Sequence, residues 1–129
     1  MTGKEFIQQF ESGNIAPPDF HHADHVRLAF AYLQQYTILE ALQRFSLALK
    51  RFAASLGKAD RYHETITYAY FFLVHERMAQ VEALEWDEFA KANPDLLVWK
   101  NGILNRYYQE RTLNSELARR VFILPDKCA

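Results

Sequence analysis

Signals that begin helices recur along this chain, and they restrict it to a fold built from helices. Thr2 with Glu5 fits the capping box, in which a threonine side chain accepts from an unpaired backbone amide and a glutamate reaches back. Thr37 with Glu40 repeats the pattern. Few stretches alternate apolar and polar residues as strands do, and the β-branched residues are scattered. The sequence therefore predicts an all-α protein.

Further caps divide the chain into helical segments. Asp19 follows a pair of helix-averse prolines and suits the N-cap of the next helix. Asp60 has the same role after the turn at Gly57, and Asn93 precedes a proline that can take the first helical position. Helices are predicted over about 3–12, 20–36, 38–56, 61–82, 86–92, 94–101 and 113–121. Short connections between consecutive helices predict an up-and-down bundle, closed by the first helix and by the short C-terminal ones.

The length and composition fit one domain with a substantial core. The chain has 129 residues, of which 50% are hydrophobic and 15% aromatic, enough for one core and too few for two ordinary domains. We therefore predict a single domain over residues 1–129. The formal net charge is −1, with both signs mixed along the chain. This charge pattern predicts that nucleic acid is not a partner.

Targeting and membrane-spanning patterns are missing from the sequence. The stretch MTGKEFIQQFE lacks the basic start and apolar run of a secretory signal. The longest apolar stretch, TYAYFFLV, is far shorter than the roughly 18 residues that a membrane span needs. Cys128 is the only cysteine, so an intramolecular disulfide or a thiolate metal cluster is impossible. These features predict a cytoplasmic protein with no membrane partner.

Three of the five histidines lie within FHHADHVRLA, at the start of the second predicted helix. At about 100° per residue, His25 shares the apolar face of that helix with Ala29 and Tyr32. His21 lies one turn earlier on the same stripe, and His22 lies on its flank. We therefore expect His25 and His21 to face the bundle interior.

A further inward-facing histidine lies at the start of the fourth predicted helix. His63 shares the apolar face with Tyr70 and Phe71, and Glu64 follows it directly. Two short connections in succession make the second and fourth helices parallel neighbours, with their first turns at the same end of the bundle. Packed helix axes lie about 8–10 Å apart, so we expect the His25 ring within about 8 Å of the His63 ring.

The connection NIAPPDF should cross this end of the bundle. Pro17 and Pro18 disfavour helix and favour extended backbone. We therefore expect the segment to form one wall of a pocket beside the histidines.

This arrangement suits a metal site or an acid–base site. Helix N-termini favour neutral imidazole and ionised carboxylate, and neutral imidazole binds a metal or accepts a proton. His21, His25 and His63 are candidate ligands for a divalent metal such as zinc or iron, with one coordination position left open. His25 and His63 are alternatively a general acid–base pair. Glu64 would then be a base or further ligand, and Tyr62 a proton donor or part of the pocket wall.

The same residues also fit a structural role. Histidines on apolar faces often bond a tyrosine or a backbone carbonyl, and the chain offers seven tyrosines. Two functions stay open: a small-molecule enzyme or metal-binding protein, and a non-catalytic ligand-binding or protein-interaction module with structural histidines. In the first case alanine at His25 or His63 should change stability by less than about 1 kcal/mol, because functional polar groups are seldom optimal for stability.

The chain contains the segments FHHADHVRLAFAYL, YHETITYAYFFL, FAKANPDLL and LARRVFILPD. Together they resemble the recurrent segments of a family of small, largely uncharacterised bacterial all-helical proteins. In that family a phenylalanine-histidine stretch ending His-Val/Ile-x-Leu-Ala precedes a Tyr-His-Glu-Thr-Ile/Val-Thr stretch. The resemblance spans most of residues 20–126. The family has no established activity, so the resemblance implies only that the two histidine segments belong together in a bacterial protein.

Overall fold

The computed structural model describes residues 1–82 and 85–127, and every regular element in this part of the chain is helical. This confirms the all-α prediction. The described residues form seven α-helices: α1 (Gly3–Glu11), α2 (His22–Gln35), α3 (Ile38–Ser55), α4 (Glu64–Gln80), α5 (Trp86–Ala92), α6 (Glu110–Leu113) and α7 (Glu116–Arg120). Four short 3-10 turns join them: η1 (Pro17–Asp19), η2 (Ala59–Arg61), η3 (Pro94–Leu97) and η4 (Ile103–Arg106). Within these residues no helix combines the length and apolarity needed to span a bilayer.

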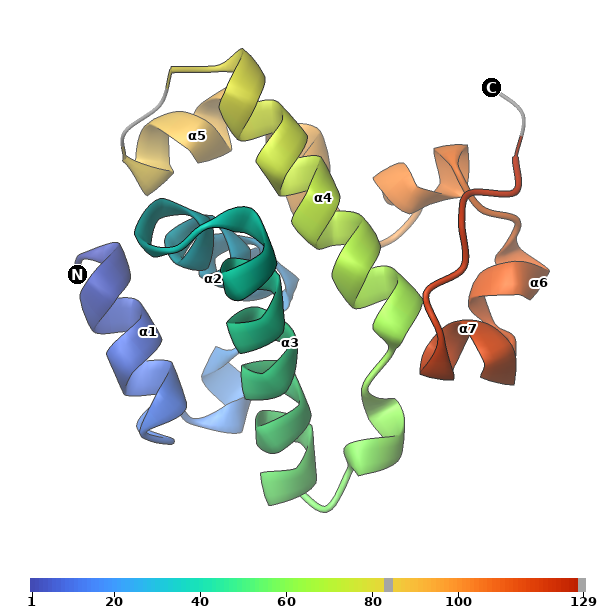
Figure 1. Ribbon diagram of the computed structural model, residues 1–129, viewed down its shortest axis with the longest axis horizontal. Coiled ribbons are helices and arrows are strands. Elements are labelled where there is room, and N and C mark those ends of the chain that lie inside the picture. The colour runs from blue at the N-terminus through green and yellow to red at the C-terminus, as the bar shows by residue number, and fades with distance from the viewer. Residues whose placement is uncertain (83–84, 128–129) are drawn as a thin grey trace.

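The centre of the fold is formed by α2, α3 and α4. As Figure 1 shows, α3 and α4 run in opposite directions, as predicted for successive helices, while α2 crosses them. Both α1 and α3 pack on α2, and α4 packs on α2 and α3. The expected parallel arrangement of α2 and α4 is therefore wrong. Tyr36 and Thr37 are both extended, so the chain turns a corner between α2 and α3 instead of folding straight back.

Aromatic contacts hold these helices together. Phe45 of α3 stacks on Phe71 of α4 with ring centroids 5.8 Å apart. On α2, Phe30 packs against Phe89 of α5 at 4.8 Å. All four phenylalanines of these two pairs are at most 2% exposed. The core thus depends on α2, whose central residues from Leu28 to Tyr32 are buried.

The helix starts agree with the sequence in part. Thr2 caps α1 as predicted, since its Oγ1 accepts from Glu5 N at 3.1 Å. Thr37 precedes α3 as predicted, but its side chain makes no cap hydrogen bond. Asp19 does not precede α2, because the prolines place it in η1 and α2 begins only after His21.

The start of α4 also differs from the prediction. Asp60 lies within η2, and α4 begins at Glu64, after His63 and three residues later than predicted. The chain leaves α3 through Gly57, whose φ of +69° favours glycine, and the residues that follow form a 3-10 turn before α4. His63 therefore takes the N-cap position that the sequence assigned to aspartate.

The C-terminal third is less helical than predicted. The predicted helix 94–101 contains only η3, and 113–121 is divided between α6 and α7. Ser115 begins α7 by accepting from Ala118 N at 3.1 Å, which explains the division. Cys128 lies outside the described residues.

Arg77 fastens the segment after α5 to α4. Its guanidinium donates to both carboxylate oxygens of Asp95, at 3.0 and 2.8 Å, and to Asn93 Oδ1 at 2.8 Å. Asn93 Nδ2 donates to Phe89 O at 3.0 Å. The Asn93 side chain was expected to cap the next helix, but it joins two elements instead.

The extended segment after α7 is held by the first turn of α4. Thr65, fully buried, donates to Val121 O at 2.8 Å and accepts from Ile123 N at 3.0 Å. The Tyr108 hydroxyl donates to Ile123 O at 2.6 Å. A single threonine thus satisfies two backbone groups that lie more than fifty residues away in sequence.

Thr65→Val should therefore destabilise the protein by about 2–3 kcal/mol, because it removes the partner of two partly buried backbone groups, the Val121 carbonyl and the Ile123 amide. Thr65→Ser keeps the hydroxyl and loses one methyl group, so we expect a loss of only about 1 kcal/mol. Urea denaturation of the three proteins measures both values. Equal losses in the two variants would show that the hydroxyl is unimportant.

Candidate functional site

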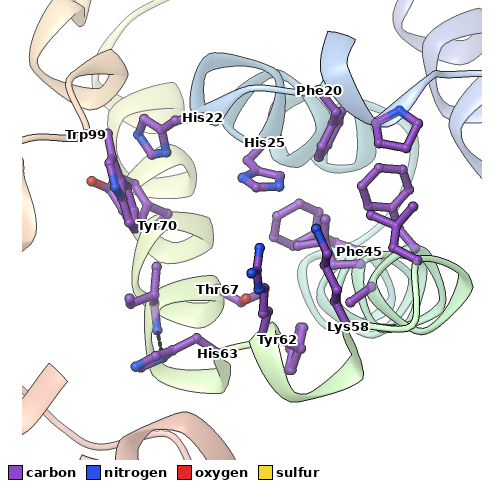
Figure 2. A pocket seen from close by; sticks show the side chains of 17 residues that line it. Phe20, His22, His25, Phe45, Lys58, Tyr62, His63, Thr67, Tyr70 and Trp99 are labelled. Carbon is purple, nitrogen blue, oxygen red and sulfur yellow. Dashed lines mark hydrogen bonds between the residues drawn. The ribbon is translucent and has the colours of Figure 1, made fainter. Parts of the chain in front are cut away.

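A cavity of about 530 Å³ lies where α2, α3 and α4 meet (Figure 2). Its size falls within the range of roughly 300–1,000 Å³ that is typical of small-molecule sites. Aromatic rings supply much of its wall: Phe20, Phe45, Phe52, Tyr62, Tyr70 and Trp99. The cavity is therefore a mainly apolar chamber at the junction of three helices.

The proline-containing connection forms one wall of this cavity, which confirms that prediction. Pro17 and Phe20 both line it. The backbone of Phe20 is extended after η1. The centroid of its ring lies 4.7 Å from that of Phe10 and 5.1 Å from that of Phe52. The ring also meets the His25 ring edge-on, with centroids 4.4 Å apart.

His25 presents an unpaired imidazole to the cavity. Neither of its ring nitrogens hydrogen-bonds to any residue within 1–82 or 85–127. The pKa of His25 is lowered to about 4, mainly by burial and to a smaller extent by His22, while Asp24 acts in the opposite direction. His25 is neutral at physiological pH, so it offers a cavity ligand one donor nitrogen and one acceptor nitrogen.

His63 also lines the cavity, but hydrogen bonds engage both of its ring nitrogens. Nδ1 accepts from Ile66 N at 3.1 Å, the contact dashed in Figure 2. Nε2 donates to Leu113 O at 2.7 Å. The two partners require the neutral Nε2–H tautomer. Binding a metal or taking a proton would require one of these bonds to break.

Tyr62 and Glu64 form a pair beside the cavity. The Tyr62 hydroxyl donates to Glu64 Oε1 at 2.7 Å, and Lys50 Nζ lies 3.8 Å from the same oxygen. Burial raises the pKa of Tyr62, and the hydrogen bond to Glu64 raises it further. The Tyr62 ring lines the cavity, but the Glu64 carboxylate does not. The Tyr62 proton and the Glu64 carboxylate, which the sequence predicted to act on a substrate, are thus hydrogen-bonded to each other.

The structure does not bring the predicted metal ligands together. His21 is exposed and lies outside the cavity wall; its backbone N donates to Asp24 Oδ2 at 2.9 Å. The expected stripe with His25 requires both residues to be helical, whereas His21 is an extended N-cap. Among the described residues, no three His, Cys, Asp or Glu side chains are grouped so that they could hold a metal ion.

Two further polar side chains line the cavity. His22 Nε2 donates to Leu96 O at 2.9 Å, its ring packs 4.7 Å from Tyr70, and burial lowers its pKa. Tyr70 is 6% exposed, and its hydroxyl has no hydrogen-bond partner in the part of the chain that the structure describes. Burial raises the pKa of Tyr70 to about 12. The sequence had placed Tyr70 on the same helical face as His63, which predicted that both side chains point inward.

Two cations at the cavity were missed by the sequence reasoning. Lys58 directly precedes η2, Arg61 is its last residue, and both line the cavity. The sequence signal was present in GKADRYH, where two basic residues lie within the five positions before His63. These two residues reach the cavity because the chain forms the 3-10 turn η2 before α4. The sequence predicted no such turn, because it assigned Asp60 as the N-cap of the helix.

Comparison of the chain with protein-family models, with curated proteins and with solved structures found no match. The two histidine segments of the resemblance both contribute to the cavity wall, through His22 and His25 in one and His63 in the other. Their rings reach the same cavity although α2 and α4 cross.

His63→Ala should cost about 2–3 kcal/mol, because it removes the cap of α4 and leaves Leu113 O unpaired. His63→Asn keeps a cap acceptor and should cost about 1 kcal/mol less. His75→Ala, at an exposed position of the same helix, is the control and should cost less than about 0.5 kcal/mol. A loss below about 1 kcal/mol for His63→Ala in urea denaturation would instead support the functional interpretation drawn from the sequence.

The depressed pKa of His25 predicts a pH-dependent stability. The unfolded state takes up a proton near pH 6.5 and the folded state only near pH 4, so stability is lost as the pH falls through this window. Between pH 7 and pH 4.5, His25→Gln should lose about 1–2 kcal/mol less than wild type, allowing for partial exposure of the ring. His75→Gln should follow wild type. Urea denaturation of the three proteins at both pH values measures these losses of unfolding free energy. Identical losses in wild type and His25→Gln would contradict the lowered pKa of His25.

Proposed function

We propose that the protein binds a small, mainly apolar molecule in the cavity between α2, α3 and α4, without transforming it. The observation that carries this proposal is the neutral, unpaired His25 ring in a mainly apolar wall. Among the described residues no side-chain nitrogen or oxygen is both buried and unpaired, so the unpaired nitrogens of His25 face the open space of the cavity. A ligand there can hydrogen-bond to His25 without displacing a protein partner.

The cavity itself supports binding. Protein interiors are close-packed and contain few voids larger than a water molecule. Phe45, Leu49 and Phe52 line a cavity of about 530 Å³ on one face of α3, so atoms on that side of these residues lack close-packed neighbours. Such a loss of packing is typical of a site retained for a ligand.

An acid–base enzyme has less support than a binding protein. With a pKa of about 4, His25 is a weak base at neutral pH. The nitrogens of His63 and the proton of Tyr62 are already engaged in hydrogen bonds. Of the metal ligands expected from the sequence, His63 has both ring nitrogens engaged and His21 lies outside the cavity wall, so only His25 of that set presents unpaired nitrogens to the cavity within the described residues. The binding module therefore agrees better with these contacts than the enzyme or metal-binding protein does.

The proposal can be tested by filling the cavity with a larger side chain and measuring how tightly a probe still binds. The probe is N-phenyl-1-naphthylamine, an uncharged molecule that fluoresces in apolar surroundings. Wild type should bind it saturably. Ala53→Phe adds a ring inside the cavity and should weaken binding by at least about tenfold, which is about 1.4 kcal/mol. Ala54→Phe, at the exposed neighbouring position outside the cavity wall, is the matched control and should change affinity less than about twofold.

Thermal unfolding of both variants checks that each is folded. Binding that is absent in wild type, or that Ala53→Phe leaves unchanged, would contradict the proposal.

A further inference from the structure

We infer that the ligand of this cavity is a carboxylate with an apolar body, held at the mouth by Lys58 and Arg61. The inference rests on the proposed function and specifies the class of molecule bound.

The charge of the cavity wall has one sign. Lys58 and Arg61 are cationic and line the cavity, and none of the described residues that line it is an aspartate or a glutamate. The rest of the wall is apolar or aromatic, apart from neutral groups such as His25 and Thr67. A ligand that complements this wall has an apolar body and a negative charge at one end.

The two cations are not neutralised by the protein. The nearby carboxylate of Glu64 is taken by the Tyr62 hydroxyl and by Lys50. No carboxylate among residues 1–82 and 85–127 forms an ion pair with Lys58 or Arg61. Both cations remain available to an anion that enters the cavity.

The turn at η2 brings both cations to one part of the cavity wall. Lys58 directly precedes η2 and Arg61 is its last residue, and Arg61 N donates to Lys58 O at 2.9 Å. The two side chains thus leave the chain three residues apart, and both line the cavity. In Figure 2 the Lys58 side chain points into the cavity, toward the side where His25 lies. One anionic group can therefore contact both cations while the body of the ligand occupies the aromatic interior.

A carboxylate is the anion that fits this pair. The planar guanidinium of Arg61 presents two parallel N–H groups that match the two oxygens of a carboxylate, and Lys58 adds a point charge. Phosphate groups are usually bound by more donors, among them the backbone amides of a helix N-terminus or nest. At α4 the His63 side chain already occupies the amide of Ile66.

Three ligands with the same apolar body test the inference by calorimetric titration: 1-naphthaleneacetate, 1-naphthaleneacetamide and 1-naphthyl phosphate. At pH 7 and low salt we expect the acetate to bind at least about tenfold more tightly than the amide, and more tightly than the phosphate. Raising the salt concentration should reduce the preference for the acetate over the amide. The double variant Lys58→Gln with Arg61→Gln should reduce it to about twofold or less.

Lys4→Gln with Arg51→Gln is the matched control, since it removes the same net charge at exposed positions outside the cavity wall. This control should keep the wild-type preference. Equal binding of acetate and amide, tighter binding of the phosphate, or loss of the preference in the control would each overturn the inference. If N-phenyl-1-naphthylamine still binds in that case, the proposed function stands; if no probe binds, both fail.

Discussion

The hydrogen bonds made by His63 and Thr65 at the start of α4 determine how the rest of the molecule is arranged. Each side chain binds backbone groups that lie far away in sequence, at Leu113 for one and at Val121 and Ile123 for the other. Within residues 1–82 and 85–127 no backbone group outside the regular helices bonds to these atoms, so burying them without His63 and Thr65 would be costly. The C-terminal third packs on α4 because two side chains supply the hydrogen bonds that its own irregular backbone cannot make.

Much of the fold was readable from local signals, because caps and apolar periodicity act within a few residues. Thr2 and Thr37 precede their helices as predicted, and α3 and α4 are antiparallel neighbours. The errors lie where proline or glycine produces a 3-10 turn, which shifts a helix start by two or three residues. The shift at α2 makes His21 an N-cap and removes it from the stripe with His25. Such turns depend on the space between packed helices, which a local pattern does not describe.

The sequence predicted where the candidate site lies better than it predicted the chemistry of its side chains. The sequence brought His25, His63 and the proline segment to one place, and all three line the same cavity. It could not separate an unpaired histidine from a bonded one, because the carbonyl that binds His63 lies fifty residues away. The cations at Lys58 and Arg61 were missed for a related reason: their proximity follows from η2, whose residues the sequence divided between a loop and a helix.

The bond between His63 and Leu113 also has a consequence for local unfolding. His63 belongs to the cavity wall and at the same time holds α6, so the C-terminal third cannot detach while this ring keeps its position. Detachment would leave the Nε2–H of the ring without its acceptor and loosen the wall, which makes the cavity and the C-terminal third one cooperative unit. Any occupant that needs an intact wall would then slow amide hydrogen exchange in α6 and α7, at a distance from the atoms it touches.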